Sequence, residues 1–374
     1  MKARVGFVIE QALGHVAYGM SLRNALAPRD DIEVVWIEVP YERRGLTRLP
    51  PFGNWTVRGS LRARRLVARA HAERPLDALF LHTQTISLFS GGLMRRIPTL
   101  LSLDATPLNL DTLAGPYDHA VAPAPVERLK RSLQRRTWRY ARAYTTWSQW
   151  AKDSLVRDYD VAARDVTVVH PGTMLANFPR RDPAPRDAAR PLQVLFVGAD
   201  LHRKGGDLLI DVCGSLHGAV ELHLVTKSVV PASPGVRVYH DVRPHSPELL
   251  ALYRNADVFA LPTRGDCLAV VLGEAMAASL PIVTTNVGAH AEAVEDGASG
   301  YVIPVDDAAA LRDRLQRLAG DRALVARMGT RARAIAEERF DMAKGANTLG
   351  DILVRIATLG RAGVAPAPRM REAV

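Results

Sequence analysis

Two adjacent cations in the second half of the chain are placed where an anion would bind. Arg203 and Lys204 follow a short apolar run, residues 194–197, and precede two glycines. The run predicts a buried parallel strand, and the glycines predict a turn into a helix. In open α/β sheets, ligands bind outside the carboxyl ends of the strands, and helix N-termini attract anions. We therefore expect Arg203 and Lys204 to hold a diphosphate.

Two carboxylates, Asp266 and Glu274, flank the start of the next predicted helix, residues 269–279. A buried strand is expected just before them, over residues 258–261. Asp266 lies in the loop and Glu274 about one turn inside the helix, so one can face a sugar and the other can hold vicinal hydroxyls. The first helix amides form a second anion cradle. It comprises Cys267, Leu268, Ala269 and Val270.

Each of these residues also has a structural interpretation. Arg203 and Lys204 are an ordinary solvated pair in that interpretation, and Asp266 caps the helix. Glu274 stands among apolar helix residues, which favours a buried acid with a polar partner over an exposed one. Three further positions at strand ends are predicted to reach the donor: Gly198, Thr226 and Lys227.

Polar residues in the first half fall at predicted strand ends as well. Gly14 and His15 follow the first strand, and either a phosphate contact or a tight turn explains the glycine. His82 and Asp104 follow later strands, where a general base would be useful. We expect Asp104 to be the acceptor-side acid, ionised at neutral pH because an ordinary aspartate has a pKa of about 3.9.

Strand and helix patterns alternate along the whole chain, which predicts two doubly wound α/β domains. The first is expected over residues 1–171, and the second over residues 192–340. A proline-rich linker, residues 172–191, separates them. An amphipathic helix is expected over residues 343–359, followed by a disordered tail, residues 360–374.

The formal net charge of the 374 residues is +10, and all of the excess lies in the first half. Residues 1–180 contain 26 Lys and Arg against 16 Asp and Glu, whereas residues 181–374 contain 23 of each. Many of the cations lie in two basic amphipathic stretches, residues 58–74 and 128–142. Such helices rest on anionic membranes or attract an anionic acceptor, although a solvated basic face explains them equally well.

Several classes of protein are disfavoured. No apolar run approaches the ~20 residues of a membrane-spanning helix, and no secretory signal opens the chain, so we expect a cytosolic protein. Cys213 and Cys267 have neither metal-site spacing nor a disulfide pattern. Asp158 and Asp160 form an acidic pair, which we interpret as a helix end. No nucleic-acid recognition motif is present.

The motifs in the second half resemble those of the family-four retaining glycosyltransferases of GT-B architecture, from about residue 144 to 340. The matching segments are Phe196-Val-Gly198, Arg203-Lys204-Gly205, the Asp266 and Glu274 pair, Pro281-Ile-Val and Asp296-Gly-Ala-Ser-Gly300-Tyr. The resemblance implies two Rossmann-like domains that face each other across a cleft, with the 343–359 helix crossing back to the first domain.

The same resemblance implies roles for individual residues. Arg203 and Lys204 would neutralise the leaving diphosphate, Glu274 would bind the ribose, and Asp266 would contact the donor sugar. The chain departs from the family at three places. Asp266-Cys-Leu-Ala replaces the usual Glu-Gly-Phe-Gly, the glycine-rich first loop is reduced to residues 11–15, and Ser102-Leu-Asp104 stands where a histidine is usual.

The function implied is transfer of a sugar from a nucleoside-diphosphate donor to an acceptor hydroxyl of a glycan, lipid or small molecule. Because cations in the site can stabilise the departing diphosphate, neither a metal ion nor a cofactor is expected. Two alternatives stay open: a non-catalytic nucleotide-sugar-binding or membrane-surface protein, and a sugar-nucleotide epimerase or phosphorylase of the same fold.

Overall fold

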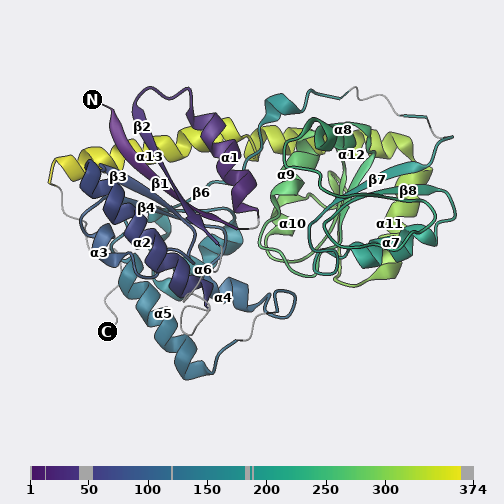
Figure 1. The fold of residues 1–374 in the computed structure, drawn as a ribbon. Helices are drawn as coiled ribbons and strands as arrows, with labels where there is room; N and C mark the ends of the chain where they lie inside the picture. The colour runs from purple at the N-terminus through teal and green to yellow at the C-terminus, as the bar shows by residue number, and fades with distance from the viewer. Residues whose placement is uncertain are drawn as a thin grey trace. The chain divides into compact units, whose positions relative to one another are not determined.

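The chain folds into two compact units, each built around a parallel sheet (Figure 1). The computed structural model describes residues 2–12, 14–41, 54–118, 121–181, 186–187 and 189–363. Unit 1 comprises residues 1–112, 120–170 and 343–374, and unit 2 comprises residues 113–119 and 171–342.

The sheet of unit 1 contains six strands, in the order β2-β1-β3-β4-β5-β6. All neighbouring strands are parallel. Apolar runs of the sequence form the strands, so the side chains of β3 and β4 are fully buried. The strands are β1 (Ala3–Gln11), β2 (Ile32–Pro40), β3 (Ala78–His82), β4 (Thr99–Leu103), β5 (Ala143–Thr146) and β6 (Val166–Val168).

Helices connect these strands, as parallel pairing requires. Two of them, α2 and α5, are the basic amphipathic stretches of the sequence. The helices of unit 1 are α1 (His15–Leu26), α2 (Trp55–Glu73), α3 (Gly91–Met94), α4 (Pro107–Asp111), α5 (Ala124–Trp138), α6 (Gln149–Tyr159), η2 (Ala163–Asp165) and α13 (Met342–Arg361).

The sheet of unit 2 also has six parallel strands, in the order β12-β11-β10-β7-β8-β9. Its strands are β7 (Leu192–Val197), β8 (Val220–Val225), β9 (Val236–Tyr239), β10 (Val258–Leu261), β11 (Ile282–Thr285) and β12 (Gly300–Ile303). Its helices are η3 (Leu175–Asn177), α7 (Gly206–Gly214), α8 (Pro247–Asn255), α9 (Val270–Ala277), α10 (His290–Ala293), α11 (Ala308–Gly320) and α12 (Arg322–Arg339).

The strand orders place a topological switch point in each sheet. In unit 2 the chain runs outward from β7 through β8 to β9 and then returns to β10 on the other side of β7, so the switch point lies between β7 and β10. In unit 1 the switch lies between β1 and β3. Ligand sites of doubly wound sheets lie at such points, outside the carboxyl ends of the strands.

The division between the units differs in detail from the sequence-based domains. Residues 113–119, expected in the first domain, group with unit 2. The expected linker also belongs to unit 2, where the Thr173 amide donates to the Phe340 carbonyl at 2.8 Å. Linker residues 182–185 and 188 lie outside the described residues. Helix α13 groups with unit 1 and continues to Arg361, where the guanidinium pairs with Asp77. The expected tail overlaps this helix end, and residues 364–374 lie outside the described residues.

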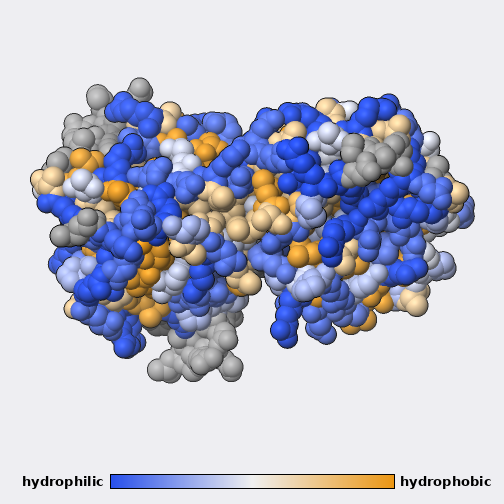
Figure 2. All heavy atoms as spheres, turned by 90° about the horizontal axis from the view of Figure 1, so that it is seen from above, coloured by the Kyte–Doolittle hydropathy of each residue, from blue (hydrophilic) through white to orange (hydrophobic). Residues whose placement is uncertain are grey.

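The surface drawn in Figure 2 is mainly hydrophilic, with hydrophobic side chains in small scattered patches. No helix among the described residues is both long enough and apolar enough to span a membrane. Both cysteines are buried free thiols, and burial raises the pKa of Cys213 to about 12.

Two glycines with left-handed backbones hold the loop after β10 in place. Gly205 has a φ of 74°, and an added Cβ would lie 2.0 Å from the Pro262 carbonyl oxygen. Gly288 has a φ of 55°, and its Cβ would lie 2.2 Å from the Asp266 carbonyl oxygen. Because neither backbone oxygen can move alone, both turns require glycine.

We expect Gly288→Ala to lower the free energy of unfolding by more than about 3 kcal/mol, because the Asp266 loop must shift. Gly297→Ala is the matched control. Gly297 also has a positive φ, 76°, but an added Cβ would meet nothing within 4 Å, so it should cost only about 1 kcal/mol. Urea unfolding of both variants measures the difference, and equal costs would contradict the steric argument.

Candidate functional site

The structure brings the two cations predicted for unit 2 to the switch point between β7 and β10. Arg203 and Lys204 lie between β7 and α7, and both side chains are nearly buried. Arg203 donates from Nη1 to the Gly265 carbonyl oxygen at 2.7 Å. Its guanidinium also lies over the Tyr117 ring, 4.7 Å from the ring centroid. Both contacts fix the cation beside the loop after β10.

Lys204 forms an ion pair with Asp266, the carboxylate predicted to face the sugar. Burial raises the pKa of Asp266, but the Lys204 ammonium, with contributions from His290 and Arg203, outweighs burial and holds the pKa below its usual value. Asp266 is therefore ionised at neutral pH. The pair places one positive and one negative group at adjacent strand ends.

His290, which the sequence analysis did not identify, supports this loop from α10. Its Nδ1 lies 2.8 Å from Thr284 Oγ1, and its Nε2 lies 3.3 Å from the Ala269 amide nitrogen. The Thr284 hydroxyl donates its proton to the Leu261 carbonyl at 2.9 Å, so His290 must donate from Nδ1 and accept at Nε2. Burial lowers the pKa of His290 to about 4, which keeps this neutral form at pH 7.

The predicted amide cradle is therefore partly occupied. Helix α9 begins at Val270, one residue later than predicted, and the Ala269 amide donates to His290. Ala269 is thus not a free donor, contrary to the prediction. The first amides of α9, which begins at Val270 in the chain after β10, have no intrahelical acceptors in the first turn. Cys267 and Leu268 belong to the loop that precedes α9, and both side chains are buried.

Glu274 is buried inside α9, 6% exposed, as its apolar neighbours predicted. The Tyr253 hydroxyl from α8 donates to Glu274 Oε2 at 2.8 Å, and His245 Nε2 lies 3.6 Å from Oε1. Burial raises the pKa of Tyr253 well above its usual value, and the Glu274 charge adds to this effect. The protein itself therefore supplies one of the polar partners that the acid requires.

Gly198 and Thr226 have structural contacts. The Gly198 amide donates to the Val225 carbonyl at 2.9 Å, and an added Cβ would meet Phe196 and Lys204 within 3.0 Å. Thr226 is buried and donates to the Ala199 carbonyl at 3.3 Å. Both residues therefore shape the turn that carries Lys204. The side chain of Lys227 is exposed.

In unit 1 the three acceptor-side candidates meet at the carboxyl ends of β1, β3 and β4. His15 Nδ1 lies 3.1 Å from His82 Nε2, and His15 Nε2 lies 3.8 Å from Asp104 Oδ2. The sequence analysis missed Glu10, whose Oε1 lies 3.4 Å from His15 Nε2. The neighbouring strand β4 holds the His82 ring, because His82 Nδ1 lies 3.1 Å from Ser102 Oγ. Four titratable groups therefore form one buried cluster.

Burial shifts the pKa values of two members of this cluster, His82 and Asp104. It lowers the pKa of His82 well below the usual value, and the neighbouring His15 lowers it further, so His82 is neutral at pH 7. It raises the pKa of Asp104, although His15 opposes the shift. The ordinary aspartate value assumed from the sequence is thus too low. Gly14 precedes α1 with a φ of −66°, which any residue adopts, so its backbone conformation does not require glycine.

The acidic pair Asp158 and Asp160 is a helix end, as predicted. Asp160 follows the last residue of α6 in a left-handed conformation and pairs with Arg135. The Ser154 hydroxyl donates to Asp158 at 2.8 Å. Both carboxylates therefore have structural partners. Among the described residues, no group of three or more His, Cys, Asp and Glu is placed to hold a metal ion.

Two family models match the chain and together span most of it. The model described as Glycosyltransferase Family 4 matches residues 14–176, and the model described as Glycosyl transferases group 1 matches residues 191–321. The chain belongs to glycosyltransferase family 4.

Relatives and solved structures agree with this assignment. A D-inositol 3-phosphate glycosyltransferase of Streptomyces bingchenggensis is 30% identical over 228 residues, which cover 54% of this chain and 50% of the relative. The chain thus spans about half the length of the curated relatives it matches. Sucrose-phosphate synthase from Thermosynechococcus elongatus matches at a TM-score of 0.75 with 17% identity, over 96% of this chain and 100% of that one.

HepE of Anabaena, solved in complex with UDP-glucose, matches at a TM-score of 0.69 with 17% identity. This match covers 94% of the chain and 99% of HepE. At such identities the likeness shows the fold, which is GT-B.

Two residues of these buried clusters, Glu10 and His290, were not identified from the sequence. Glu10 directly follows the strand predicted over residues 5–9, and the observed strand β1 continues through it to Gln11. The two Glu10 oxygens accept from Thr83 and Thr85 hydroxyls at 2.8 Å, and these residues are distant in sequence. His290 follows Gly288 at the end of β11. A polar residue just beyond a predicted strand was its only available signal.

The buried neutral His290 makes the stability of unit 2 depend on pH. Because its folded pKa, about 4, lies below the ordinary 6.5, the unfolded chain binds more protons between these values. Stability contributed by His290 is therefore complete above pH 6.5 and is lost as the pH falls towards 4. The Asp266 contribution is lost at lower pH, because its folded pKa lies below its usual value.

We expect His290→Gln to reduce the loss of unfolding free energy between pH 6.5 and pH 4.5 by on the order of 2 kcal/mol. Urea unfolding at the two pH values measures this. His217→Asn, at an exposed histidine of the same unit, should leave the loss unchanged. Identical pH dependence in the wild type and His290→Gln would show that His290 titrates in the folded protein as it does in the unfolded chain.

Proposed function

We propose that this family 4 protein is a retaining glycosyltransferase that transfers a sugar from a nucleoside-diphosphate-sugar donor to an acceptor hydroxyl without a metal ion. One observation carries the proposal. At the switch point of unit 2, Arg203, Lys204 and Asp266 stand together beside the N-terminus of α9. Cations for a diphosphate and an acid for a sugar thus occupy the place where nucleotides bind in sheets of this kind.

The proposed donor lies with its diphosphate against Arg203, Lys204 and the first turn of α9. Lys204 has three N–H donors, so it can hold Asp266 and a phosphate oxygen together. The ribose is proposed to lie against Glu274, whose Oε1 faces His245 at 3.6 Å while its Oε2 accepts from Tyr253. UDP-sugars are the first donors to test, because HepE, of the same fold, was solved with UDP-glucose.

In the proposed reaction, the bond between the anomeric carbon and the diphosphate oxygen breaks as the acceptor oxygen bonds to the same face of that carbon. The acceptor proton passes to the departing diphosphate oxygen. The cations stabilise the charge that develops on the diphosphate, which is the task otherwise given to a metal ion. Asp104, with His15 beside it, is proposed to bind the acceptor hydroxyl within unit 1.

The acceptor is proposed to be a hydroxyl of a polyol, glycan or lipid. Curated relatives are named for D-inositol 3-phosphate, which makes phosphorylated polyols a reasonable first panel. The family models and the named relatives do not favour the non-catalytic, epimerase and phosphorylase alternatives.

We expect thermal stabilisation by one nucleotide sugar from a UDP, GDP and ADP panel in EDTA. A donor at 100 times its dissociation constant stabilises by about 2.7 kcal/mol. Lys204→Ala and Glu274→Gln should abolish the shift, whereas Lys130→Ala, at an exposed lysine of α5, should retain it. Melting without ligand checks that each variant folds. A donor that stabilises all four proteins equally, or that requires a divalent ion, would count against the proposal.

We further propose that unit 1 contacts anionic membranes through α5. Three apolar side chains form an exposed stripe on this helix: Val126 (43% exposed), Leu129 (70%) and Leu133 (39%). The exposed cations Arg128, Lys130 and Arg136 accompany the stripe. The buried residues Gln134 and Trp138 project from another face. Apolar and cationic residues on one exposed helix suit the interface of an anionic bilayer.

We expect the protein to sediment with vesicles that contain anionic lipid at low salt, and to be released as salt is raised. Leu129→Gln should weaken binding roughly tenfold, because it removes the most exposed apolar contact of the stripe. Leu359→Gln, at an exposed leucine of α13, is the control and should bind like the wild type. Equal binding to neutral and anionic vesicles would rule out this mode of attachment.

A further inference from the structure

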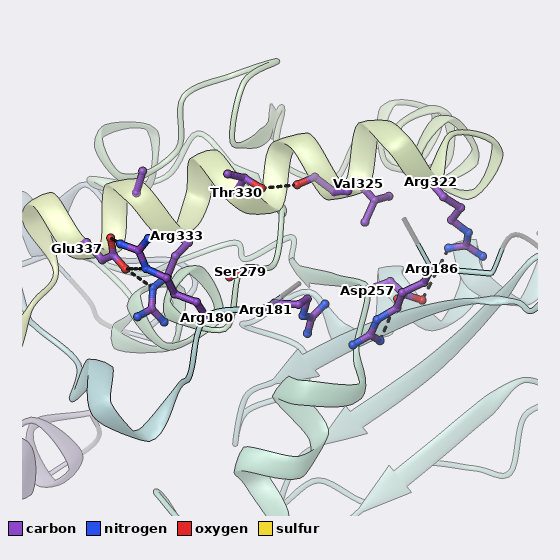
Figure 3. Close-up of a pocket in the computed structure, with 12 residues that line it drawn as sticks. Arg180, Arg181, Arg186, Asp257, Ser279, Arg322, Val325, Thr330, Arg333 and Glu337 are labelled. Carbon is purple, nitrogen blue, oxygen red and sulfur yellow. Dashed lines mark hydrogen bonds and ion pairs between the residues drawn. The ribbon is translucent and has the colours of Figure 1, made fainter. Parts of the chain in front are cut away.

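Several arginines of unit 2 are held by carboxylates. A cavity at the amino-terminal edge of the sheet, where Asp257 precedes β10, shows this arrangement (Figure 3). Asp257 pairs with Arg186 at 3.2 Å. Glu337 pairs with Arg333 at 2.7 Å. Each of these guanidinium groups thus has an acid that compensates its charge and accepts from some of its donors. Arg203, at the opposite ends of the strands, is held differently.

The acid that pairs with Arg203 is largely exposed. Asp200 Oδ2 lies 3.4 Å from Arg203 Nε, and the Asp200 side chain is 52% exposed, so water screens the pair. Arg203 Nη1 donates to the Gly265 carbonyl at 2.7 Å. Its Nη2 has no hydrogen-bond partner among the described residues, and this atom is not fully buried. Arg203 therefore keeps most of its charge and part of its donor set.

An aromatic ring from a distant part of the sequence covers Arg203. The guanidinium carbon of Arg203 lies 4.7 Å from the centroid of the Tyr117 ring. Tyr117 belongs to residues 113–119, which lie between α4 and α5 in sequence but group with unit 2. A cation over an aromatic face is attracted by the ring quadrupole, and the attraction is stronger where water is excluded. The Arg203 side chain is 11% exposed, which meets this condition.

The segment that carries Tyr117 has anchors of its own in unit 2. It packs against Gly265, where an added Cβ would lie 2.5 Å from Pro116 Cβ and 3.7 Å from Tyr117 Cδ2. Leu113 is buried, and its carbonyl accepts from the Tyr117 amide at 3.3 Å. The position of the ring therefore does not depend on Arg203 alone, so the ring can hold the cation in place.

Stacking leaves the edges of the guanidinium open. Its five N–H donors point outward in the plane of the group, whereas Tyr117 covers a face. A phosphate binds through the in-plane donors, so the ring and a diphosphate do not compete for the same atoms. Lys204 is held in the other way, by an ion pair with Asp266 that compensates its charge. The ring thus fixes a cation without compensating it.

We propose that Tyr117 is a positioning residue of the donor site, which holds Arg203 in the orientation that meets the diphosphate. The proposal rests on the proposed function, because it takes a nucleoside diphosphate as the ligand of Arg203. A free arginine side chain has many rotamers and loses this freedom when it binds a ligand. The ring restricts Arg203 before the ligand arrives, so the diphosphate binds more tightly.

Calorimetric titration of the whole chain with UDP, GDP and ADP measures the effect. For the nucleotide that binds the wild type, Tyr117→Leu should weaken affinity roughly tenfold, because it removes the cation–π contact. Tyr117→Phe keeps the ring face and should bind within about twofold of the wild type. Tyr140→Leu is the matched control and should bind normally, since it removes the ring that stacks on Arg139 at 4.8 Å in unit 1. Unfolding without ligand checks each variant.

A double-mutant cycle shows whether Tyr117 acts through Arg203. In an Arg203→Gln background, Tyr117→Leu should weaken affinity no further. Equal losses in both backgrounds would overturn the proposal, as would unchanged affinity in Tyr117→Leu alone, and both results leave the proposed function standing. A wild type that binds none of the three nucleotides would overturn the proposed function as well. Tyr117 is partly exposed, so its variants should fold, and Tyr117→Gln replaces Tyr117→Leu if that variant does not.

Discussion

The loops at the switch point of unit 2 are arranged around the buried ion pair of Lys204 with Asp266. Two charges this far from water are tolerated only when each satisfies the other and further donors complete the shell. Two kinds of contact hold the loop that carries Asp266. Gly205 and Gly288 allow neighbouring backbone to pack closely against it, and the neutral His290 accepts a hydrogen bond from its Ala269 amide. A pair held in this way is preorganised, so a phosphate would meet a cation that is already fixed.

Unit 1 also buries titratable side chains at its switch point, but these are of other types. Its cluster contains Glu10, His15, His82 and Asp104, and none of these side chains is lysine or arginine. Burial therefore acts by shifting proton equilibria: the pKa of His82 falls and that of Asp104 rises. Such a cluster is suited to orienting a hydroxyl or moving a proton, whereas the switch point of unit 2 is suited to holding fixed charge. The two sheets thus place different chemistry at equivalent topological positions.

How far the sequence predicts this arrangement depends on the range of the contacts involved. Apolar runs and turn residues are local, so the strands expected over residues 194–197 and 258–261 were found within two residues of those bounds. The predicted strand ends led directly to Arg203, Lys204 and Asp104. The partners of buried polar groups are set by tertiary contacts. The bond of Ala269 to His290 spans 21 residues and that of Glu10 to Thr83 spans 73, so no local pattern reports them. The grouping of residues 113–119 with unit 2 escaped prediction for the same reason.

Net charge is likewise a poor guide to where cations gather. Residues 181–374 contain equal numbers of acids and bases, yet two groups of neighbouring cations lie in this part of the chain. One lies beyond the carboxyl end of β10 and the other at its amino end, where Asp257 is shared among Arg186, Arg190 and Arg322. A parallel strand separates the two groups, so each has its own set of partners. The net charge of a long segment therefore does not report where its cations gather, because tertiary contacts decide which of them lie together.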